Sequence, residues 1–422
     1  MLFRVKNLGL IDEAEIKLDG ITVLTGENNV GKSTIGRMLY CVNNALMYDG
    51  VEEIRIYRLE RTIENYLREH SILPLRKIKD LLYDTAIAKK IIAEHDNLNK
   101  EDPSQGVLRY TFSIFFLEDE DFDVEFLENK ILEILKLSDQ DISSELLDIA
   151  IGTNFSGTTH NIYGENDLTR IELRLGDSER YVRITVAEDV SIDNSKNIAF
   201  GEAIYIESPR VVHDTDKKLT ESSFFLNFDS RQRLVQLLTD DSEADYWEKK
   251  EIDLEIKNIL DKISTLAPGK LVRESSLTRR LVYEEGNHRF DLINVSSGVK
   301  TFAILKKLLT DCKLKRRGIL ILDEPEIHLH PDWQLVFAEI LVLLQKQFNL
   351  KILINTHSTY FLMAIEEYST GYKIDDKCNY YLIKREGNHS TCKDCTDNLN
   401  KIYQHLANSL DTLDNLRWED DQ

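Results

Sequence analysis

Residues 26–33 read Gly-Glu-Asn-Asn-Val-Gly-Lys-Ser, and this run constrains the fold more than any other part of the sequence. It fits the pattern G-x-x-x-x-G-K-S/T, in which glycines let the backbone curl so that successive N–H groups face phosphate oxygens. A strand-like segment, Ile21–Thr25, precedes the run, and an apolar helical segment begins at Ser33. Together these features predict an α/β fold in which a helix N-terminus faces bound phosphates.

The residue types in this loop predict specific roles. Lys32 is expected to reach the β- and γ-phosphates of a nucleotide, and the Ser33 hydroxyl is expected to bind magnesium. The nucleotide-binding residues predicted from this segment are Gly26, Glu27, Asn28, Asn29, Val30, Gly31, Lys32, Ser33 and Thr34.

A second segment combines a buried strand with two acids. Residues 318–324 read Gly-Ile-Leu-Ile-Leu-Asp-Glu, and such a continuous apolar run suits a central parallel strand that is buried on both faces. Ligands of parallel sheets bind at the carboxyl ends of the strands, so both acids are expected beside the phosphate loop. Asp323 is predicted to hold magnesium, directly or through water, and Glu324 to act as general base toward the attacking water.

Two further segments give weaker signals. Ile352–Ser358 is an apolar strand with a polar tip, and His357 in that tip is predicted to contact the γ-phosphate. Val295–Lys300 directly opens a helix, and by itself its Ser-Ser-Gly would predict only a helix N-cap. Its position, about 25 residues before Asp323 and directly at a helix start, makes Ser296, Ser297 and Gly298 candidates for a functional role.

The four segments together resemble the ATP-binding-cassette (ABC) superfamily. The order is that of its motifs: Walker A at 26–33, signature at 295–300, Walker B at 319–324 and switch histidine at 357. The resemblance implies ATP and Mg²⁺ as cofactors and Mg²⁺-dependent ATP hydrolysis as the activity. It also implies that Glu324 and His357 are catalytic and that Ser33 and Asp323 hold the metal.

A narrower resemblance is carried by Glu27–Ser33, Ser296–Gly298 and Glu324–Pro331. These segments look like those of bacterial AAA-15 and AAA-21 ATPases, which are related to OLD-family nucleases. ATPase subunits of anti-phage systems such as PARIS and Septu belong to the same group. The opening residues Phe3–Gly9 resemble the start of the branch that contains RecF, Rad50 and SMC proteins. In this superfamily the signature contacts the γ-phosphate held by another subunit, so the resemblance implies at least a homodimer.

Two departures from the wider superfamily matter. Residues 295–299 read Val-Ser-Ser-Gly-Val, whereas the signature of transporters is Leu-Ser-Gly-Gly-Gln, which argues against a transporter subunit. The glutamine of the Q-loop has no clear counterpart. Ser208-Pro209-Arg210 resembles a Pro-Arg element of the AAA-15 ATPases.

The chain of 422 residues is predicted to divide into three parts. Residues 1–45 and 200–375 are expected to form a split ABC-type P-loop ATPase domain around a central mixed, largely parallel sheet. Residues 46–199 are expected to form a mixed helical and strand insertion between Walker A and signature, with a strand at 107–116. Residues 376–422 are expected to form a C-terminal hairpin and helices.

Charge and composition limit the kinds of binding partner and the cellular location that the sequence predicts. A formal net charge of −21 does not indicate nucleic-acid binding. Because Lys and Arg cluster at 313–317, nucleic-acid binding still stays open. No apolar run approaches the ~20 residues needed to span a bilayer, and the N-terminus lacks a signal-peptide pattern. A cytoplasmic location without a membrane partner is therefore expected. A zinc site is also conceivable, with candidate ligands Cys378, His389, Cys392 and Cys395.

The predicted function is an ATP-hydrolysing subunit that dimerises around ATP and regulates a separate effector, a nuclease, in prokaryotic anti-phage defence. No nuclease site of its own is evident, because the chain after His357 looks too short for a metal-binding TOPRIM domain. The main competing hypothesis is a RecF-like ATPase that clamps DNA during repair. Two weaker hypotheses are a transporter ATPase subunit and a nucleotide-binding scaffold with negligible turnover.

Overall fold

The computed structural model describes residues 1–46, 48–70, 87–98, 124–164, 167–176, 181–187, 190–194, 201–216, 228–240, 246–275, 278 and 280–407. Contacts divide the chain into two units, one made of Met1–Ala45 and Leu146–Gln422 and the other of Leu46–Glu145. The strand predicted at 107–116 lies outside the described residues.

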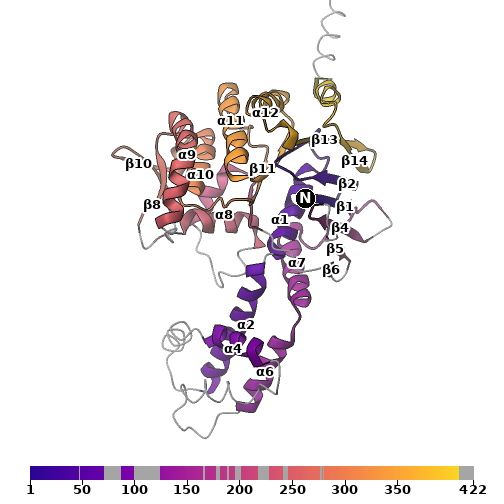
Figure 1. The fold of residues 1–422 in the computed structure, drawn as a ribbon, viewed down its shortest axis with the longest axis vertical. Coiled ribbons are helices and arrows are strands. Elements are labelled where there is room, and N and C mark those ends of the chain that lie inside the picture. The colour runs from indigo at the N-terminus through magenta and orange to yellow at the C-terminus, as the bar shows by residue number, and fades with distance from the viewer. Residues whose placement is uncertain are drawn as a thin grey trace, which may run out of the picture. The chain divides into compact units, whose positions relative to one another are not determined.

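The larger unit is built on a mixed sheet, which confirms the predicted α/β class (Figure 1). Within the described residues the sheet has eleven strands in the order β6-β5-β4-β1-β2-β14-β13-β3-β12-β11-β7. Their bounds are β1 Leu2–Leu8, β2 Ile11–Lys17, β3 Ile21–Thr25, β4 Thr169–Arg174, β5 Tyr181–Val186, β6 Val190–Asn194, β7 Ala203–Ile206, β11 Ile319–Asp323, β12 Lys351–Thr356, β13 Cys378–Glu386 and β14 His389–Asp394.

Parallel pairing aligns the ends of the strands that carry the predicted site. β13, β3, β12, β11 and β7 run parallel to one another, whereas the pairs among β2, β1, β4, β5 and β6 are antiparallel. β14 joins the two groups, antiparallel to β13 and parallel to β2. Asp323 pairs with Asn355, and Thr356 pairs with Thr25 at the start of the phosphate loop. The carboxyl ends of β3, β12 and β11 therefore meet at one edge, which is where ligands of parallel sheets bind.

Helices cover both faces of the parallel strands. α1 (Lys32–Ala45) packs on one face, where Gly36 lies against Ile321 and Leu353. Alternate residues of β11, Leu320 and Leu322, point to the other face, because successive side chains of a strand point to opposite sides. The other helices and 3₁₀ segments of this unit are α8 Ser230–Thr239, α9 Tyr246–Leu266, α10 Ser297–Thr310, α11 Pro331–Phe348, α12 Thr359–Gly371, η1 Pro209–Asp216, η3 Leu292–Asn294 and η4 Asp375–Lys377.

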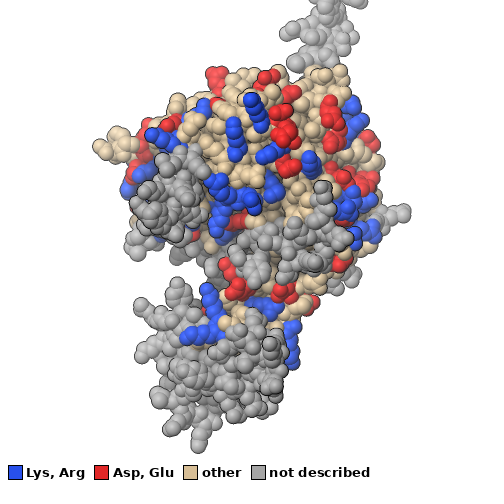
Figure 2. All heavy atoms as spheres, viewed as in Figure 1, with Lys and Arg blue, Asp and Glu red and all other residues tan. Residues whose placement is uncertain are grey.

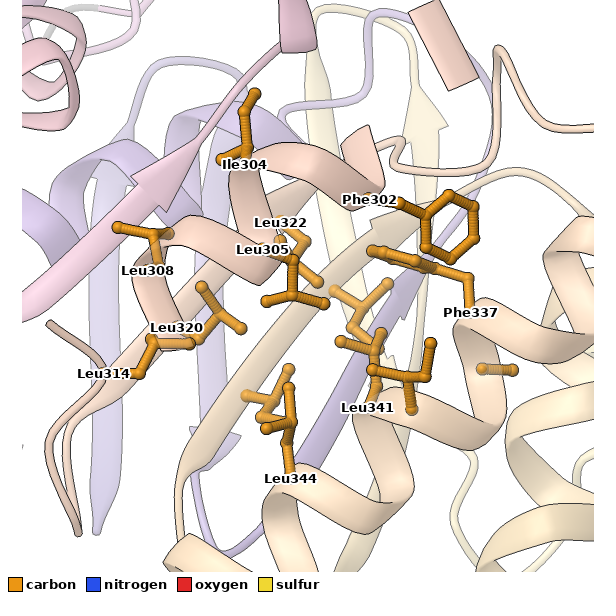
Figure 3. Close-up of a cluster of buried hydrophobic side chains, with 14 of the residues drawn as sticks. Phe302, Ile304, Leu305, Leu308, Leu314, Leu320, Leu322, Phe337, Leu341 and Leu344 are labelled. Carbon is orange, nitrogen blue, oxygen red and sulfur yellow. The ribbon is translucent and has the colours of Figure 1, made fainter. Parts of the chain in front are cut away.

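The main hydrophobic core lies between β11 and the helices α10 and α11 (Figure 3). Phe302 of α10 meets Phe337 of α11 edge to face, with ring centroids 5.5 Å apart. A continuous apolar strand and two apolar helix faces together exclude water from this layer. The labelled side chains of the cluster are Phe302, Ile304, Leu305, Leu308, Leu314, Leu320, Leu322, Phe337, Leu341 and Leu344.

The bounds of α11 follow from local signals. Pro331 occupies the first turn, where its missing N–H costs no hydrogen bond, and His330 Nδ1 accepts from the Asp332 N–H at the N-cap. Asp332 in the first turn and Lys346 in the last turn complement the helix dipole. Asn349 ends the helix in the left-handed conformation that terminates helices.

Two asparagines of α1 form hydrogen bonds with backbone groups at the edge strand β7. Asn44 accepts a hydrogen bond from Ala203 N at 2.9 Å and donates one to Ala203 O at 3.0 Å, as a neighbouring strand would. Asn43 donates to Gly201 O at 2.6 Å. These hydrogen bonds pair backbone groups that an edge strand would otherwise leave unpaired. They also hold β7 beside β11.

A second sheet and a smaller unit complete the described structure. β8 (Lys270–Arg273), β9 (Leu281–Glu285) and β10 (His288–Asp291) form an antiparallel sheet within the larger unit. The smaller unit contains α2 Tyr48–His70, α4 Ile87–Leu98 and α6 Val124–Lys136, which share a core cluster of their own. α7 spans Asp139–Phe155, and residues 400–407 are helical. No helix in the described part of the chain is long and apolar enough to cross a membrane.

Candidate nucleotide-binding site

The predicted phosphate loop connects β3 to α1 in a tightly curled conformation. Gly26 has a φ of 146°, and a Cβ there would lie 2.3 Å from Ile383 O of β13, so only glycine fits. Asn29 also has a positive φ, of 61°. The curl places the N-terminus of α1 beside the ends of the parallel strands, where backbone N–H groups and the helix dipole favour an anion.

Lys32 lies buried at the start of α1 and folds back over the loop. Its ammonium donates to Gly26 O at 2.9 Å and to Glu27 O at 2.7 Å. Burial lowers the pKa of Lys32, and the nearby carboxylates of Glu324 and Asp323 oppose that shift. The Lys32 ammonium therefore lies where phosphate oxygens of a bound nucleotide would take the place of the Gly26 and Glu27 carbonyls as hydrogen-bond acceptors.

Asp323, at the end of β11, joins three other segments. Its Oδ1 accepts from Ser33 Oγ at 2.9 Å and from Asn355 Nδ2 at 3.0 Å. Its Oδ2 accepts from the Tyr205 hydroxyl of β7 at 3.0 Å. The predicted metal ligands Ser33 and Asp323 are therefore in direct contact.

These groups fit a magnesium ion. Mg²⁺ binds oxygen ligands, and a hydroxyl next to a carboxylate supplies two of them. Asn355 Oδ1 is buried and has no hydrogen-bond partner among the described residues, so this corner also holds an acceptor for a metal-bound water. Ser33 and Asp323 are the residues that would hold the ion.

Glu324 follows Asp323 in a backbone conformation that is rare for a residue with a side chain. Its φ is 46°, and its N–H donates to Asn355 O at 2.9 Å. His357 Nδ1 lies 3.2 Å from Glu324 Oε1, so the predicted base and the predicted switch histidine form a pair. Unusual backbone conformations of this kind cluster at functional sites.

One cavity of about 740 Å³ brings most of the predicted residues together. Asn28, Asn29, Val30, Gly31, Lys32, Ser33, Thr34, Asp323 and Glu324 all line it. Gly26 and Glu27 contribute the carbonyl groups that hold Lys32. The volume is in the range of small-molecule sites.

The signature segment does not line this cavity. Ser296 is exposed and caps α10, with its hydroxyl accepting from Val299 N at 3.4 Å. Ser297 begins α10, and Gly298 is buried, where a Cβ would lie 3.1 Å from His328 O and 3.2 Å from the Trp333 ring. Within one chain, the signature is therefore separate from the phosphate loop.

Several residues of the site were not predicted. Tyr205 and Asn355 hold Asp323, and the segment Thr158–Tyr163 lines the cavity together with Arg385 of β13. Asn355 lies in the polar tip of the strand predicted at Ile352–Ser358, so the sequence already indicated that it lies near the site. Ser208 and Pro209 of the Pro-Arg element also line the cavity.

The cysteine-rich hairpin shows no metal geometry. No group of three or more His, Cys, Asp or Glu side chains suited to a metal ion occurs in the described part of the chain. Burial raises the pKa of Cys378 to about 11 and that of Cys392 to about 12, so both thiols are protonated at neutral pH. The zinc hypothesis gains no support.

The fold and the site define a P-loop nucleoside triphosphatase: strand, phosphate loop and helix, with an acid pair at the end of a neighbouring parallel strand. The chain matches the AAA ATPase domain family AAA_15 over residues 1–362 and belongs to that family.

Distant similarity to solved structures accompanies this match. An SMC head bound to the C-winged helix domain of ScpA has 11% identity and a TM-score of 0.44, covering 93% of this chain and 96% of that chain. The SMC head domain from Thermotoga maritima has 10% identity and a TM-score of 0.37, covering 93% and 97%. An SMC head with an extended coiled coil, bound to the C-terminal domain of ScpA derived from Pyrococcus furiosus, has 10% identity and a TM-score of 0.42, covering 99% and 98%. The family membership rests on the match over residues 1–362.

Glu326 is a buried carboxyl directly behind the site. Its side chain is only 3% exposed, and its Oε1 accepts a hydrogen bond from Thr356 Oγ1 at the end of β12. Oε2 has no partner among the described residues. Burial raises the pKa of Glu326, so the folded protein holds a proton that the unfolded chain releases at lower pH.

We expect Glu326→Gln to stabilise the protein at pH 8 more than at pH 5. The folded-state pKa is raised, so the stability that the neutral carboxyl contributes is present below the unfolded pKa and is lost as pH rises through the folded pKa. Glutamine stays neutral throughout and can accept from Thr356. Thermal unfolding at both pH values measures the effect, with exposed Glu367→Gln as control. An equal effect of Glu326→Gln at both pH values would contradict this assignment.

Proposed function

We propose that this protein binds ATP with Mg²⁺, hydrolyses it, and dimerises around it to regulate a separate effector protein. The observation that carries the proposal is the Asp323 carboxylate, which accepts from Ser33 and Asn355 in a cavity that Lys32 and Glu324 also line. This combination of a cation, a hydroxyl and two acids suits the phosphates of a metal–nucleotide complex.

The proposed chemistry uses groups of this chain. Lys32 leaves the carbonyls of Gly26 and Glu27 and donates to phosphate oxygens. Glu324 accepts a proton as a water oxygen bonds to the γ-phosphorus, and the bond from that phosphorus to the bridging oxygen of ADP breaks. His357 orients the Glu324 carboxylate through their 3.2 Å contact. Mg²⁺ at Ser33 and Asp323 would neutralise charge on the phosphates.

Dimerisation is proposed because Ser296 is exposed and does not line the cavity of its own chain. A second copy would bring its Ser296 and the N-terminus of its α10 to the γ-phosphate, since a helix N-terminus favours an anion. Each site would then be complete only in the dimer.

We expect Lys32→Ala to weaken ATP binding by roughly 100-fold, because the phosphates lose a charge-assisted donor. Equilibrium titration with a fluorescent ATP analogue measures the affinity. Lys373→Ala, which removes an exposed lysine after α12, is the matched control. Unchanged affinity in Lys32→Ala would refute the site.

We expect Glu324→Gln to slow ATP hydrolysis by about 10²–10⁴-fold, because the amide cannot accept the proton of the attacking water. Binding should remain, so an ATP-dependent dimer should accumulate in light scattering. Adding Ser296→Arg should abolish that dimer without changing the ATP affinity of the single subunit. A Glu324→Gln protein that stays monomeric with bound ATP would contradict dimerisation around ATP.

The effector is proposed to be a separate nuclease in prokaryotic anti-phage defence. Support comes from membership in an ATPase family, together with the absence of metal-binding groups of three or more acidic, His or Cys residues in the described part of the chain. On the face drawn in Figure 2, Lys and Arg side chains are interspersed with Asp and Glu side chains, and the net charge is −21. A groove for the phosphate backbone would instead require clustered positive charge.

A cleavage assay separates this proposal from a DNA-clamping ATPase. The protein is purified without neighbours and incubated with plasmid DNA, ATP and either Mg²⁺ or Mn²⁺. We expect neither cleavage nor ATP-dependent retention of the DNA at physiological salt. Cleavage or retention that disappears with Lys32→Ala would favour a self-sufficient DNA enzyme or clamp.

A further inference from the structure

The cavity extends beyond the groups that suit phosphates. Lys32, Ser33, Asp323 and Glu324 line it and supply the groups that suit a triphosphate and its metal. The lining continues to the β1–β2 turn at Gly9 and Leu10, to the segment Thr158–Tyr163 and to Arg385. A nucleotide carries its base at the end opposite to the γ-phosphate, so this further lining is available to a base.

Exposed apolar side chains also line the cavity. Ile162 is 70% exposed and Tyr163 is 59% exposed, although both line the cavity. Only eight large hydrophobic residues are exposed in the described part of the chain, and three of them line this one cavity: Ile162, Tyr163 and Ile327. Apolar side chains that gather at a cavity mark a surface that a ligand covers.

The segment that carries Tyr163 is anchored on both sides. The Asn161 N–H donates to Asn7 Oδ1 at 3.2 Å, and Asn161 Nδ2 donates to Asn388 O at 3.0 Å. Asn161 Oδ1 accepts from Tyr163 N at 2.9 Å. Asn161 thus ties Tyr163 to the end of β1 and to the β13–β14 turn.

A second set of contacts fixes the same segment to the β1–β2 turn. Gly9 N donates to Thr159 O at 2.6 Å. The Thr159 and Thr169 hydroxyls lie 2.9 Å apart, and Thr169 Oγ1 donates to Asn7 O at 2.8 Å. These contacts hold the backbone that carries Tyr163 at the cavity that the phosphate loop also lines, and a segment held in place loses little conformational entropy when a ligand binds to it.

We propose that Tyr163, supported by Ile162, forms the nucleobase subsite of this ATPase and stacks on the adenine of ATP. The inference rests on the proposed function, because it assigns a further part of the lining of the same cavity. Aromatic rings and bases stack through their flat π-faces, and a purine offers the larger face. The ring thus adds affinity for the nucleoside without contacting the phosphates.

Comparing ATP with inorganic tripolyphosphate tests the subsite, because tripolyphosphate lacks the base and the ribose. Dissociation constants are measured by competition against a fluorescent ATP analogue for the wild-type protein, Tyr163→Ala and Tyr163→Phe. We expect Tyr163→Ala to raise the Kd of ATP by roughly 5- to 100-fold and to leave that of tripolyphosphate unchanged. Tyr163→Phe should retain the wild-type affinity, because it keeps the ring. Tyr360→Ala, an exposed tyrosine of α12 outside the cavity lining, is the matched control.

Three results would overturn the subsite. They are an unchanged ATP affinity in Tyr163→Ala, an equal loss for ATP and tripolyphosphate, and a loss confined to ATP-dependent dimerisation, which would assign Tyr163 to contact with a second copy. The proposed function fails differently. In that case the wild-type protein binds neither ligand, or Lys32→Ala binds both as the wild type does.

Discussion

The site depends on one carboxylate. Asp323 accepts hydrogen bonds from Ser33 of α1, Asn355 of β12 and Tyr205 of β7, so it joins the ends of neighbouring parallel strands to the phosphate loop. This is possible because parallel pairing brings carboxyl ends to one edge of a sheet. The same carboxylate lies close enough to Lys32 to interact with its ammonium.

Rigid packing behind this edge connects the other proposed elements of the site. The ring centroid of Phe302 in α10 lies 5.9 Å from that of Trp333 and 5.5 Å from that of Phe337, both in α11. The ring centroids of Phe337 and of Phe361 in α12 are 6.2 Å apart. α10 begins at the signature, and α12 begins two residues after His357. A displacement of one of these helices would disturb the packing of the other two, because protein interiors are close-packed.

The amino-acid pattern alone predicted the parts of the molecule that depend on local signals. The strand Ile21–Thr25 has the predicted bounds, because apolar runs and turn residues act over a few residues. The α/β class followed from the phosphate loop between a strand and a helix. The apolar run before Asp323 and Glu324 also indicated that these acids share one edge with Lys32, since acids that end a parallel strand stand at its carboxyl end.

Only the tertiary structure showed which distant residues complete the site. Tyr205 reaches Asp323 because β7 pairs with β11, and no local pattern marks that tyrosine. The segment Thr158–Tyr163 reaches the cavity through hydrogen bonds to β1 and to the β13–β14 turn, which are far away in the sequence. Local composition determines where strands, loops and helices form, whereas long-range pairing determines which side chains meet, and that pairing depends on how the whole core packs.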